Sequence, residues 1–531
     1  GDGYASPLAG SEVTIRGVIT RIVPDSGFYL EEPASDVSAE TSNGIFIEDE
    51  SLRHSMLPGH EIVISGRVTE LGQSRDTLTS LTDVSAGVTC ATGLDLPAST
   101  LSLPLDSRQR EAVEAMRVSI AQQLNVTDVY NFYRGTVTLS ANGSLRVPTE
   151  VMPPGKAAAN QARKNRERSI QAALGTANAT LLRNGSVVPG AKGVMGYDDR
   201  GQILLIDQPL ESDLPPPPGL AAPSGDLIRV VSMNLLNFFN GDGTGGGFPT
   251  VRGAKSYEGF IAQSNRIKSA LSVMQPTVIA VQELENDGYG ELSASRSLLD
   301  LLTEAVAADW RAVETRSRLL GGDVIKVGLF YRADILEAVG QPHVLDSQPF
   351  RNLSRQPLAQ LFRERSSGVP FLVVANHLKS KGSCPESGKN ADQHDGQGCW
   401  NPARVEAANA VTAWVDKLIQ GTGATGALIL GDMNAHRQED PIRAFRDAGL
   451  IDPVEQLSGL PQTSYVYRGE AGTLDYAFAT SDLAKDVRHA ENWNVNAEWP
   501  QNVDLPQPWL RYSDHDPVIL DLDFSQSATS D

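Results

Sequence analysis

Short apolar runs that end directly in polar residues recur through the C-terminal half of the chain, and they constrain its fold more than any other feature. These runs include Leu227–Val231, Val278–Val281, Phe371–Ala375 and Ala427–Leu430. Runs of this length that are rich in β-branched residues are typical of buried strands. Polar side chains at the ends of core strands are held rigidly and can converge on one point. The pattern predicts an α/β domain with a polar site at its strand ends.

The polar residues after these runs carry the chemistry of a hard-metal site. Glu283, Asp432, Asn434 and Asp514 offer the carboxylate and amide oxygens that magnesium prefers, and Asn234 is expected to ligate the metal or to orient a bound water. A bound divalent cation polarises a phosphoryl oxygen and lowers the pKa of water. These residue types therefore predict metal-assisted hydrolysis of a phosphate ester.

Two histidines complete this chemistry. His515 is flanked by carboxylates and is the predicted general base, since its ordinary pKa lies near neutrality; it also joins the predicted metal set. Asp475 is the candidate carboxylate that fixes its tautomer, and His377 is expected to bind the scissile phosphate or to assist the leaving group. Each motif alone is weak, because Gly-Asp turns and Asp-His pairs are common. Their order and strand-end placement favour catalysis.

The motif series resembles that of the endonuclease/exonuclease/phosphatase (deoxyribonuclease I-like) superfamily over roughly residues 226–524. The resemblance implies a four-layer α/β sandwich, with two mixed sheets face to face, helices outside and the active site at one end of the sheets. It also implies that Asp432 and Asn434 place the nucleophile and bind metal. The matching segments are Ser232-Met233-Asn234, Gln282-Glu283-Leu284-Glu285, Asn376-His377-Leu378-Lys379, Gly431-Asp432-Met433-Asn434, Leu474-Asp475-Tyr476 and Ser513-Asp514-His515.

A long insert follows His377, and together with the N-terminal region it resembles large secreted bacterial nucleases that carry an oligonucleotide-binding (OB) type β-domain ahead of the catalytic domain. Lys379 and Lys381, just past His377, are predicted phosphate contacts, with solvated loop lysines as the alternative. Arg332, which follows the expected strand Val327–Phe330, is a further candidate, with a structural role as its alternative.

Residues 1–100 are predicted to form a small OB-like β-barrel. Phe28 and Tyr29 are candidates for stacking on bases, although side-chain alternation should turn at least one of them into the core. The expected strands are Glu12–Ile22, Gly27–Glu31, Gly44–Glu48, Glu61–Leu71 and Leu78–Val84.

Residues 101–213 are predicted to form a second β-rich accessory region that contains a helix from Lys156 to Ile170. The basic residues Arg163, Lys164 and Arg166 of this helix are the predicted backbone contacts for nucleic acid, with a solvated helix face as the alternative. A proline-rich linker at 214–225, the catalytic domain at 226–524 and a frayed tail at 525–531 complete the expected organisation.

Three cysteines bear on the cellular compartment. Cys384 and Cys399 bracket a Gly/Asp/Gln-rich loop and are predicted to form a disulfide, which implies an oxidising environment; two free thiols are the alternative. Cys90 is then expected to be a small buried apolar residue. The start at Gly1-Asp2-Gly3 is interpreted as following a removed signal peptide, and no apolar run approaches the ~18–20 residues of a membrane span.

The net charge of −20 sits awkwardly with a polyanionic substrate, because long-range attraction to DNA needs a basic surface. The motifs nevertheless predict a secreted or periplasmic, monomeric endonuclease that hydrolyses DNA, or RNA, with Mg²⁺ or Mn²⁺ and without a stable protein partner. Ca²⁺ is a further candidate, at the Asp392–Asp395 loop. The alternatives are a phosphatase or a sphingomyelinase-type lipid phosphodiesterase, and a non-catalytic nucleic-acid-binding or adhesion protein.

Overall fold

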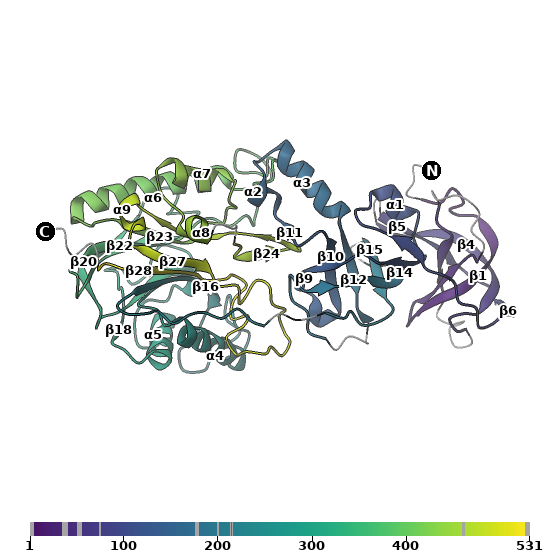
Figure 1. Cartoon of the computed structure of the whole chain (residues 1–531), viewed down its shortest axis with the longest axis horizontal. Helices are drawn as coiled ribbons and strands as arrows, with labels where there is room; N and C mark the ends of the chain where they lie inside the picture. The colour runs from purple at the N-terminus through teal and green to yellow at the C-terminus, as the bar shows by residue number, and fades with distance from the viewer. Residues whose placement is uncertain are drawn as a thin grey trace. The chain divides into compact units, whose positions relative to one another are not determined.

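The computed structural model describes residues 5–33, 41–49, 56–73, 76–85, 87–175, 180–198, 201–212, 214, 216–458 and 462–525. Its contacts divide the chain into two compact units, whose elements are labelled in Figure 1. The N-terminal unit comprises residues 1–145, 163–215 and 500–502, and the C-terminal unit comprises residues 146–162, 216–499 and 503–531. The predicted boundary near residue 100 lies inside the N-terminal unit, and the five-part division of the chain stays a prediction.

A closed ring of strands opens the N-terminal unit, as its all-β pattern predicts. The sheet order is β1-β2-β3-β5-β4-β6, and a further pairing of β1 with β4 closes the ring. The strands agree with the expected ranges to within two residues at each end. They are β1 (Glu12–Val23), β2 (Gly27–Glu31), β3 (Gly44–Glu48), β4 (Glu61–Gln73) and β5 (Asp76–Thr82). The sixth strand, β6 (Val88–Ala91), was not predicted.

Two aromatic residues of β2 correct the predicted stacking role. Phe28 is fully buried in the barrel core with Ile47 and Leu81, and Tyr29 is 2% exposed and packs against Phe46 with ring centroids 4.9 Å apart. Both rings are therefore used in packing, so neither can stack on a base. Cys90 is also corrected, because it is exposed rather than buried.

A second sheet completes the N-terminal unit, in the order β13-β9-β10-β12-β15-β14-β8-β7. Its buried residues include Val126, Leu139 and Leu204. The strands are β7 (Ser99–Leu101), β8 (Arg117–Ile120), β9 (Leu124–Asp128), β10 (Thr136–Ala141), β12 (Ser169–Ala173), β13 (Val187–Val188), β14 (Ala191–Asp198) and β15 (Gly201–Ile206), with helix α1 (Ser107–Glu111) before β8. The predicted helix is α3 (Lys156–Glu167), of which residues 156–162 belong to the C-terminal unit. It ends before the predicted Ile170, which lies in β12.

Glu114 makes the stability of this unit depend on pH. Burial raises the pKa of its carboxyl group from an ordinary 4.5 to about 8, and Oε1 accepts a hydrogen bond from the backbone N–H of Thr79 at 2.9 Å. The folded state holds this proton more tightly than the unfolded chain does, so its stabilising effect is complete below pH 4.5 and is lost as the pH rises to about 8.

We expect the difference in unfolding free energy between the wild type and Glu114→Gln to change by about 2 kcal/mol from pH 5 to pH 7, at roughly 1.4 kcal/mol per pKa unit. The wild type should lose stability relative to the variant as the pH rises, because only the wild type must ionise a buried group. Urea unfolding of both proteins at the two pH values measures this, and parallel pH profiles would contradict it.

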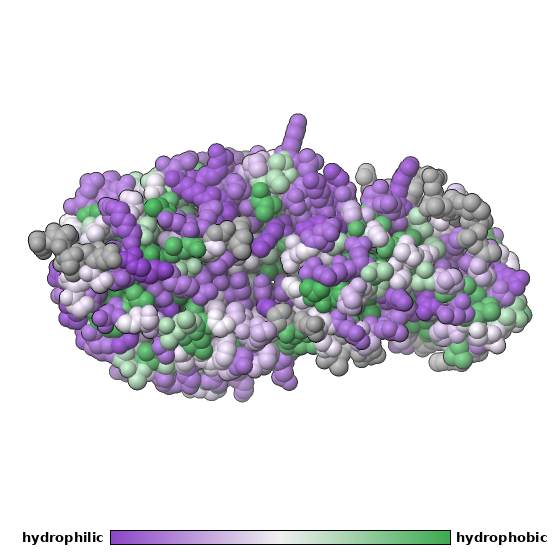
Figure 2. Space-filling view, viewed as in Figure 1, coloured by the Kyte–Doolittle hydropathy of each residue, from purple (hydrophilic) through white to green (hydrophobic). Residues whose placement is uncertain are grey.

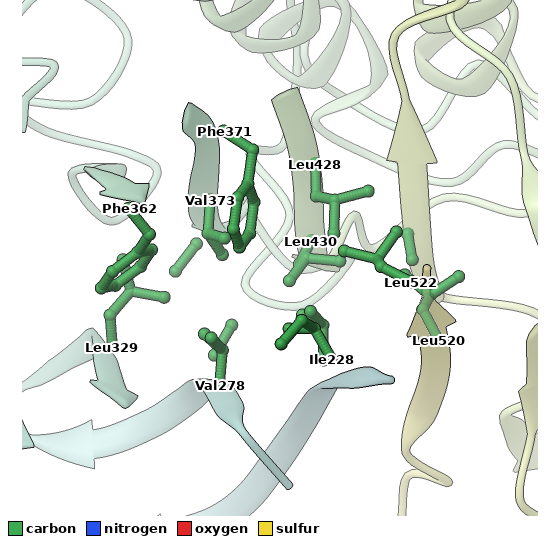
Figure 3. Packing of buried hydrophobic residues seen from close by; sticks show 14 of the residues in the cluster. Ile228, Val278, Leu329, Phe362, Phe371, Val373, Leu428, Leu430, Leu520 and Leu522 are labelled. Atoms are coloured by element: carbon green, nitrogen blue, oxygen red, sulfur yellow. The ribbon is translucent and has the colours of Figure 1, made fainter. Parts of the chain in front are cut away.

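Two mixed sheets pack face to face in the C-terminal unit, and helices cover their outer faces, so the predicted four-layer sandwich is confirmed. Figure 1 shows α6 and α7 on one side of the sheets, and α4 and α5 on the other. Apolar side chains of both sheets meet between them, including Ile228, Val278 and Leu520 from one sheet and Phe371 and Leu428 from the other (Figure 3).

The first sheet has the order β18-β19-β17-β16-β28-β27 and the second β20-β21-β22-β23-β26. Their strands are β16 (Ile228–Phe238), β17 (Val278–Glu285), β18 (Trp310–Ala312), β19 (Ile325–Arg332), β20 (Leu336–Val344), β21 (Leu358–Glu364), β22 (Pro370–His377), β23 (Ala427–Asp432), β26 (Asp475–Ala479), β27 (Val487–Asn492) and β28 (Val518–Leu522). The helices are α4 (Tyr257–Met274), α5 (Ala294–Ala305), α6 (Asn401–Thr422), α7 (Asp440–Asp447), α8 (Pro453–Ser458) and α9 (Ser481–Ala484).

Segments outside the sandwich belong to the same unit. Residues 216–225 of the predicted linker join it, and the carbonyl of Pro218 accepts a hydrogen bond from the Trp493 indole at 3.0 Å. The predicted Cys384–Cys399 disulfide is confirmed. Apart from Ser525, the predicted frayed tail lies outside the described residues.

Hydrophobic residues make up 40% of the sequence, as is usual for a globular protein, and the surface view agrees with this. On the face seen in Figure 2, hydrophilic side chains predominate and apolar ones form small scattered groups. Among the described residues, we find no helix with the length and apolar character needed to cross a membrane.

Candidate active site

Strand register gathers polar side chains at one edge of the second sheet. His377 ends β22 directly opposite Asp432, which ends β23, and Asp432 in turn pairs with Asp475, the first residue of β26. Asn434 follows in a tight turn, because its backbone N–H donates to Asp432 Oδ1 at 2.8 Å. Its side-chain Nδ2 donates to the carbonyl of Leu378 at 3.2 Å, which leaves Oδ1 for a ligand.

The first sheet contributes Asn234 from β16 and Glu283 from β17. Glu283 Oε2 accepts a hydrogen bond from the backbone N–H of Asn237 at 2.9 Å, and its φ of 61° places it in the left-handed region. Such a conformation is rare for a residue with a long side chain and is kept where surrounding contacts impose it. Burial, and after it the nearby Asp514 carboxylate, raises the pKa of Glu283.

His515 and Asp475 form a buried pair. His515 Nδ1 lies 2.7 Å from Asp475 Oδ2, and the same oxygen accepts a hydrogen bond from Ser464 Oγ at 2.7 Å. This contact fixes the imidazole so that Nε2 is the free ring nitrogen. Burial lowers the pKa of His515, but Asp475 and the two other nearby carboxylates outweigh that effect and raise it well above its ordinary value.

His377 lies between a carboxylate and a guanidinium. Its Nε2 is 3.6 Å from Asp432 Oδ2 and 3.5 Å from Arg355 Nη1, and Arg355 Nε also lies 3.0 Å from Asp323 Oδ2. Burial, followed by the positive charge of Arg355, lowers the pKa of His377 well below its ordinary value. We therefore expect His377 to be neutral at pH 7. A neutral imidazole can donate a hydrogen bond to a phosphate oxygen, or accept one from a protonated phosphate.

Chemistry and charge at this site fit a divalent cation. Ligand atoms of Asp432, Asp475 and His515 lie within 4.8 Å of one another, and burial raises the pKa of Asp432 to about 7. Within the described residues, Asp432 forms an ion pair with neither lysine nor arginine. A cation held by Asp432, Glu283 and the neighbouring amide oxygens would offset these negative charges.

Comparison with known proteins identifies the family. The sequence model of the Endonuclease/Exonuclease/phosphatase family matches residues 232–515, which is more than half of the chain.

The chain belongs to the endonuclease/exonuclease/phosphatase family.

Members of this family are hydrolases that act on phosphoester bonds, and the family generally uses divalent metals. The chain is similar to three solved structures, and each similarity covers 56% of this chain. The human Nocturnin catalytic domain with bound sulfate has 17% sequence identity, with 94% of that chain covered and a TM-score of 0.38. A Bacteroides thetaiotaomicron mannosyl-6-phosphatase has 20% identity, 100% of that chain covered and a TM-score of 0.38, and a humanized D. rerio TDP2 has 14% identity, 100% covered and a TM-score of 0.36. No curated protein matches the sequence.

The two lysines predicted to contact phosphate, Lys379 and Lys381, bind groups of the chain itself in this structure. Lys379 Nζ donates to the carbonyls of Ser380 and Gly382, both at 3.1 Å, and Lys381 Nζ lies 2.6 Å from the buried Glu439. Both ammonium groups therefore bind the chain itself.

Arg332 is a clear correction. It ends β19, which runs antiparallel to β17 with Tyr331 opposite Val278, so it lies at the other end of the sheet from Glu283. Its guanidinium pairs instead with Asp334 at 2.6 Å. A strand pattern alone does not show which edge of the sheet a strand end reaches.

Two further predictions remain untested by these contacts. Arg163 pairs with Glu167 at 2.6 Å within α3, and residues 163–215 belong to the N-terminal unit, so a nucleic-acid role for Arg163, Lys164 and Arg166 stays a prediction. In the candidate calcium loop, Asp392 and Asp395 accept backbone hydrogen bonds from His394 and Gln397 at 2.8 and 2.9 Å. Calcium binding there also stays a prediction.

Three further residues lie beside the histidine sites without any motif in the sequence to mark them. Ser464 binds Asp475, Arg355 lies beside His377, and the ring of Tyr465 lies 4.5 Å from that of His515. Each precedes its catalytic neighbour by at least ten residues in a loop or short strand without periodicity. The family motifs therefore gave no local signal for them.

Proposed function

We propose that this protein is a secreted, divalent-metal-dependent phosphodiesterase that cleaves DNA internally. The observation that carries the proposal is the buried His515–Asp475 pair, joined at 2.7 Å, beside the carboxylate of Asp432 at the strand ends. Family membership supports phosphoester hydrolysis, and the Cys384–Cys399 disulfide supports an oxidising compartment.

The residues of the site divide the work of hydrolysis among them. Asp475 holds His515 so that its Nε2 can accept a proton from the attacking water once nearby negative charge is offset. Asp432 and Asn434 orient that water, and neutral His377 with Arg355 binds the phosphate oxygens. A divalent cation, when bound, polarises the phosphoryl oxygen and lowers the pKa of water.

A polymeric substrate is supported by the accessory part of the chain. The family acts on nucleic-acid or phosphate substrates, and the closed β-ring of the N-terminal unit is an architecture that oligonucleotide-binding proteins use. The buried Phe28 and Tyr29 mean that any contact with bases must come from other residues. The OB assignment itself stays a prediction.

Removal of divalent metal should abolish cleavage. We expect the purified protein to nick supercoiled plasmid with Mg²⁺ or Mn²⁺, to stop when EDTA is added in excess, and to resume when Mg²⁺ is restored, because the buried carboxylates then regain their counter-charge. Gel analysis of nicked, linear and fragmented DNA measures this, and cleavage that persists in EDTA would contradict it.

The same assay separates the main alternative. A protein that leaves plasmid, linear DNA and RNA intact, yet releases phosphate from monoesters or headgroups from phospholipid vesicles, would be a phosphatase or lipid phosphodiesterase that uses the same site. Product that appears as linear fragments rather than mononucleotides would indicate internal cleavage.

A further inference from the structure

Residues 146–162 belong to the C-terminal unit, although the chain on both sides of them belongs to the N-terminal unit. The segment is anchored by main-chain hydrogen bonds. The N–H of Val147 donates to the carbonyl of Ala471 at 3.0 Å, and the N–H of Gln438 donates to the carbonyl of Thr149 at 2.9 Å. The short helix α2 (Pro148–Val151) therefore lies between the segments that follow Asn434 and precede Asp475.

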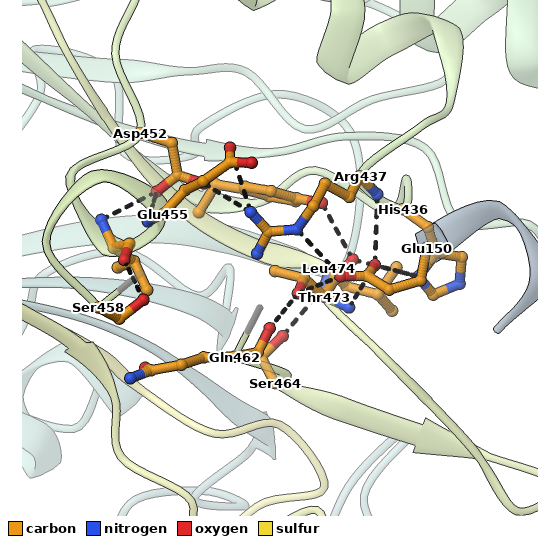
Figure 4. Close-up of polar contacts among 12 residues, drawn as sticks. Glu150, His436, Arg437, Asp452, Glu455, Ser458, Gln462, Ser464, Thr473 and Leu474 are labelled. Atoms are coloured by element: carbon orange, nitrogen blue, oxygen red, sulfur yellow. Dashed lines mark hydrogen bonds and ion pairs between the residues drawn. The ribbon is translucent and has the colours of Figure 1, made fainter. Parts of the chain in front are cut away.

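Glu150, in this helix, is 2% exposed and both of its carboxylate oxygens are occupied (Figure 4). Oε1 accepts from Arg437 Nε at 3.1 Å and lies 3.0 Å from Thr473 Oγ1, whose hydroxyl also lies 2.7 Å from the carbonyl of Gln462. Oε2 accepts from the backbone N–H groups of Arg437 at 3.3 Å and Thr473 at 3.0 Å. One buried carboxylate thus bridges the main chain of two separate segments.

Both bridged segments carry proposed active-site residues. Arg437 is three residues after Asn434, and Thr473 is two residues before Asp475. The two segments also touch directly, since His436 Nδ1 lies 3.2 Å from the carbonyl of Thr473. Strand pairing of Asp432 with Asp475 sets the register of the two strands, and the Glu150 contacts link the segments just beyond that pair.

Charge neutralisation alone does not explain Glu150. Arg437 keeps two other carboxylates, with Nη1 3.2 Å from Glu455 Oε2 and 3.8 Å from Asp452 Oδ2. The distinct contribution of Glu150 is its link to the backbone and hydroxyl of Thr473. Backbone contacts of this kind fix the positions of neighbouring side chains rather than supply charge to the reaction.

We infer that Glu150 is a positioning residue for hydrolysis: by binding Arg437 and Thr473 together, it fixes the turn at Asn434, just beyond the paired strands, against the His515–Asp475 pair. The inference rests on the proposed phosphodiesterase function. It gives Glu150, in the segment 146–162 that precedes the family domain, a supporting role at the active site.

Glu150→Gln in the full-length chain tests this. The amide keeps the volume but offers one acceptor oxygen, so its NH₂ group must face at least one N–H donor, the Arg437 Nε–H in its better orientation. We expect kcat to fall by about 10- to 100-fold, the range found when groups that orient ligands or reactants are displaced, with KM changed by less than about threefold. Met152→Ala, an exposed change in the same segment, should leave kcat and KM unaltered.

Thr473→Val is the second variant, in case Glu150→Gln does not fold. It removes the hydroxyl, which contacts both Glu150 Oε1 and the carbonyl of Gln462, but keeps the backbone N–H, so we expect a smaller loss of about 3- to 10-fold in kcat. Urea unfolding under assay conditions gives the folded fraction of each variant. A loss of activity that only follows the folded fraction would overturn the inference, because Glu150 would then serve stability alone.

A measurement without turnover separates this inference from the proposed function. The proton on His515 Nδ1, which is hydrogen-bonded to Asp475, can be followed by NMR. Its signal is assigned as the one that disappears in His515→Ala. A changed shift or faster solvent exchange in folded Glu150→Gln or Thr473→Val supports positioning, and an unchanged signal in both overturns it. If the wild type cleaves no phosphodiester, the proposed function fails, while this signal still decides whether Glu150 positions the pair.

Discussion

Replacing His515 with alanine should lower the rate of metal-dependent phosphodiester cleavage by about 10³-fold or more, at the upper end of what one general acid–base group contributes. The effect is expected in kcat, because His515 is assigned to proton transfer in the transition state rather than to substrate binding. His515 is 7% exposed, and it contacts Asp475 at 2.7 Å and the ring of Tyr465 at 4.5 Å. Urea unfolding of the variant gives the folded fraction by which its rate is corrected. Steady-state cleavage of a short labelled duplex measures kcat and KM.

His489→Ala is the matched control. His489 lies on β27 with an exposed side chain, and its Nε2 contacts Glu491 at 3.1 Å. We expect its replacement to change cleavage by less than about twofold, since exposed pairs contribute little. Asp475→Asn should resemble His515→Ala more than this control, because it removes the anion that holds Nδ1. Wild-type cleavage by folded His515→Ala would exclude His515 as the general base.

Strand-end motifs made the core of the site predictable. A buried strand with a polar residue at its end is a local pattern, and the structure places His377 and Asp432 at the ends of β22 and β23, with Asp475 at the start of β26. Parallel pairing of β22 with β23 then aligns their ends without any further information. The barrel strands were predictable for the same reason, since alternation and turn residues are local.

Contacts between distant segments were not predictable in this way. Glu150 reaches Arg437 and Thr473 across 287 and 323 residues, and no periodicity in a four-residue helix marks it as buried. Proximity in sequence also misled: Lys381 follows His377 closely, yet it pairs with Glu439, 58 residues away. The buried carboxylate of Glu439 needs a cation, and this need determines where the Lys381 side chain lies more than its closeness to His377 in the sequence does.

The second large effect concerns stability. Asp521→Asn should lower the unfolding free energy of the C-terminal unit by about 3–5 kcal/mol, the usual cost of breaking one side of a buried ion pair. Arg229 on β16 faces Asp521 on β28 in a cross-strand pair, with Nε–Oδ1 and Nη2–Oδ2 distances of 2.7 Å each. Arg229 is 1% exposed, so its guanidinium would keep its charge without an anion or water to stabilise it.

Asp523→Asn, two residues along the chain, is the matched control. Asp523 pairs with Arg488 at 3.3 Å, but both side chains are about one-third exposed, so its loss should cost less than about 1 kcal/mol.

Arg229→Met combined with Asp521→Leu should recover much of the stability lost in Asp521→Asn, because apolar side chains can replace a buried ion pair. Urea unfolding of the three variants decides the point. Similar costs for Asp521→Asn and Asp523→Asn would show that burial does not govern the strength of this pair. A double variant no more stable than Asp521→Asn would instead show that the hydrogen bonds from Arg229 Nη1 to the carbonyls of Ala221 and Met274, at 2.9 and 3.0 Å, matter more than its charge.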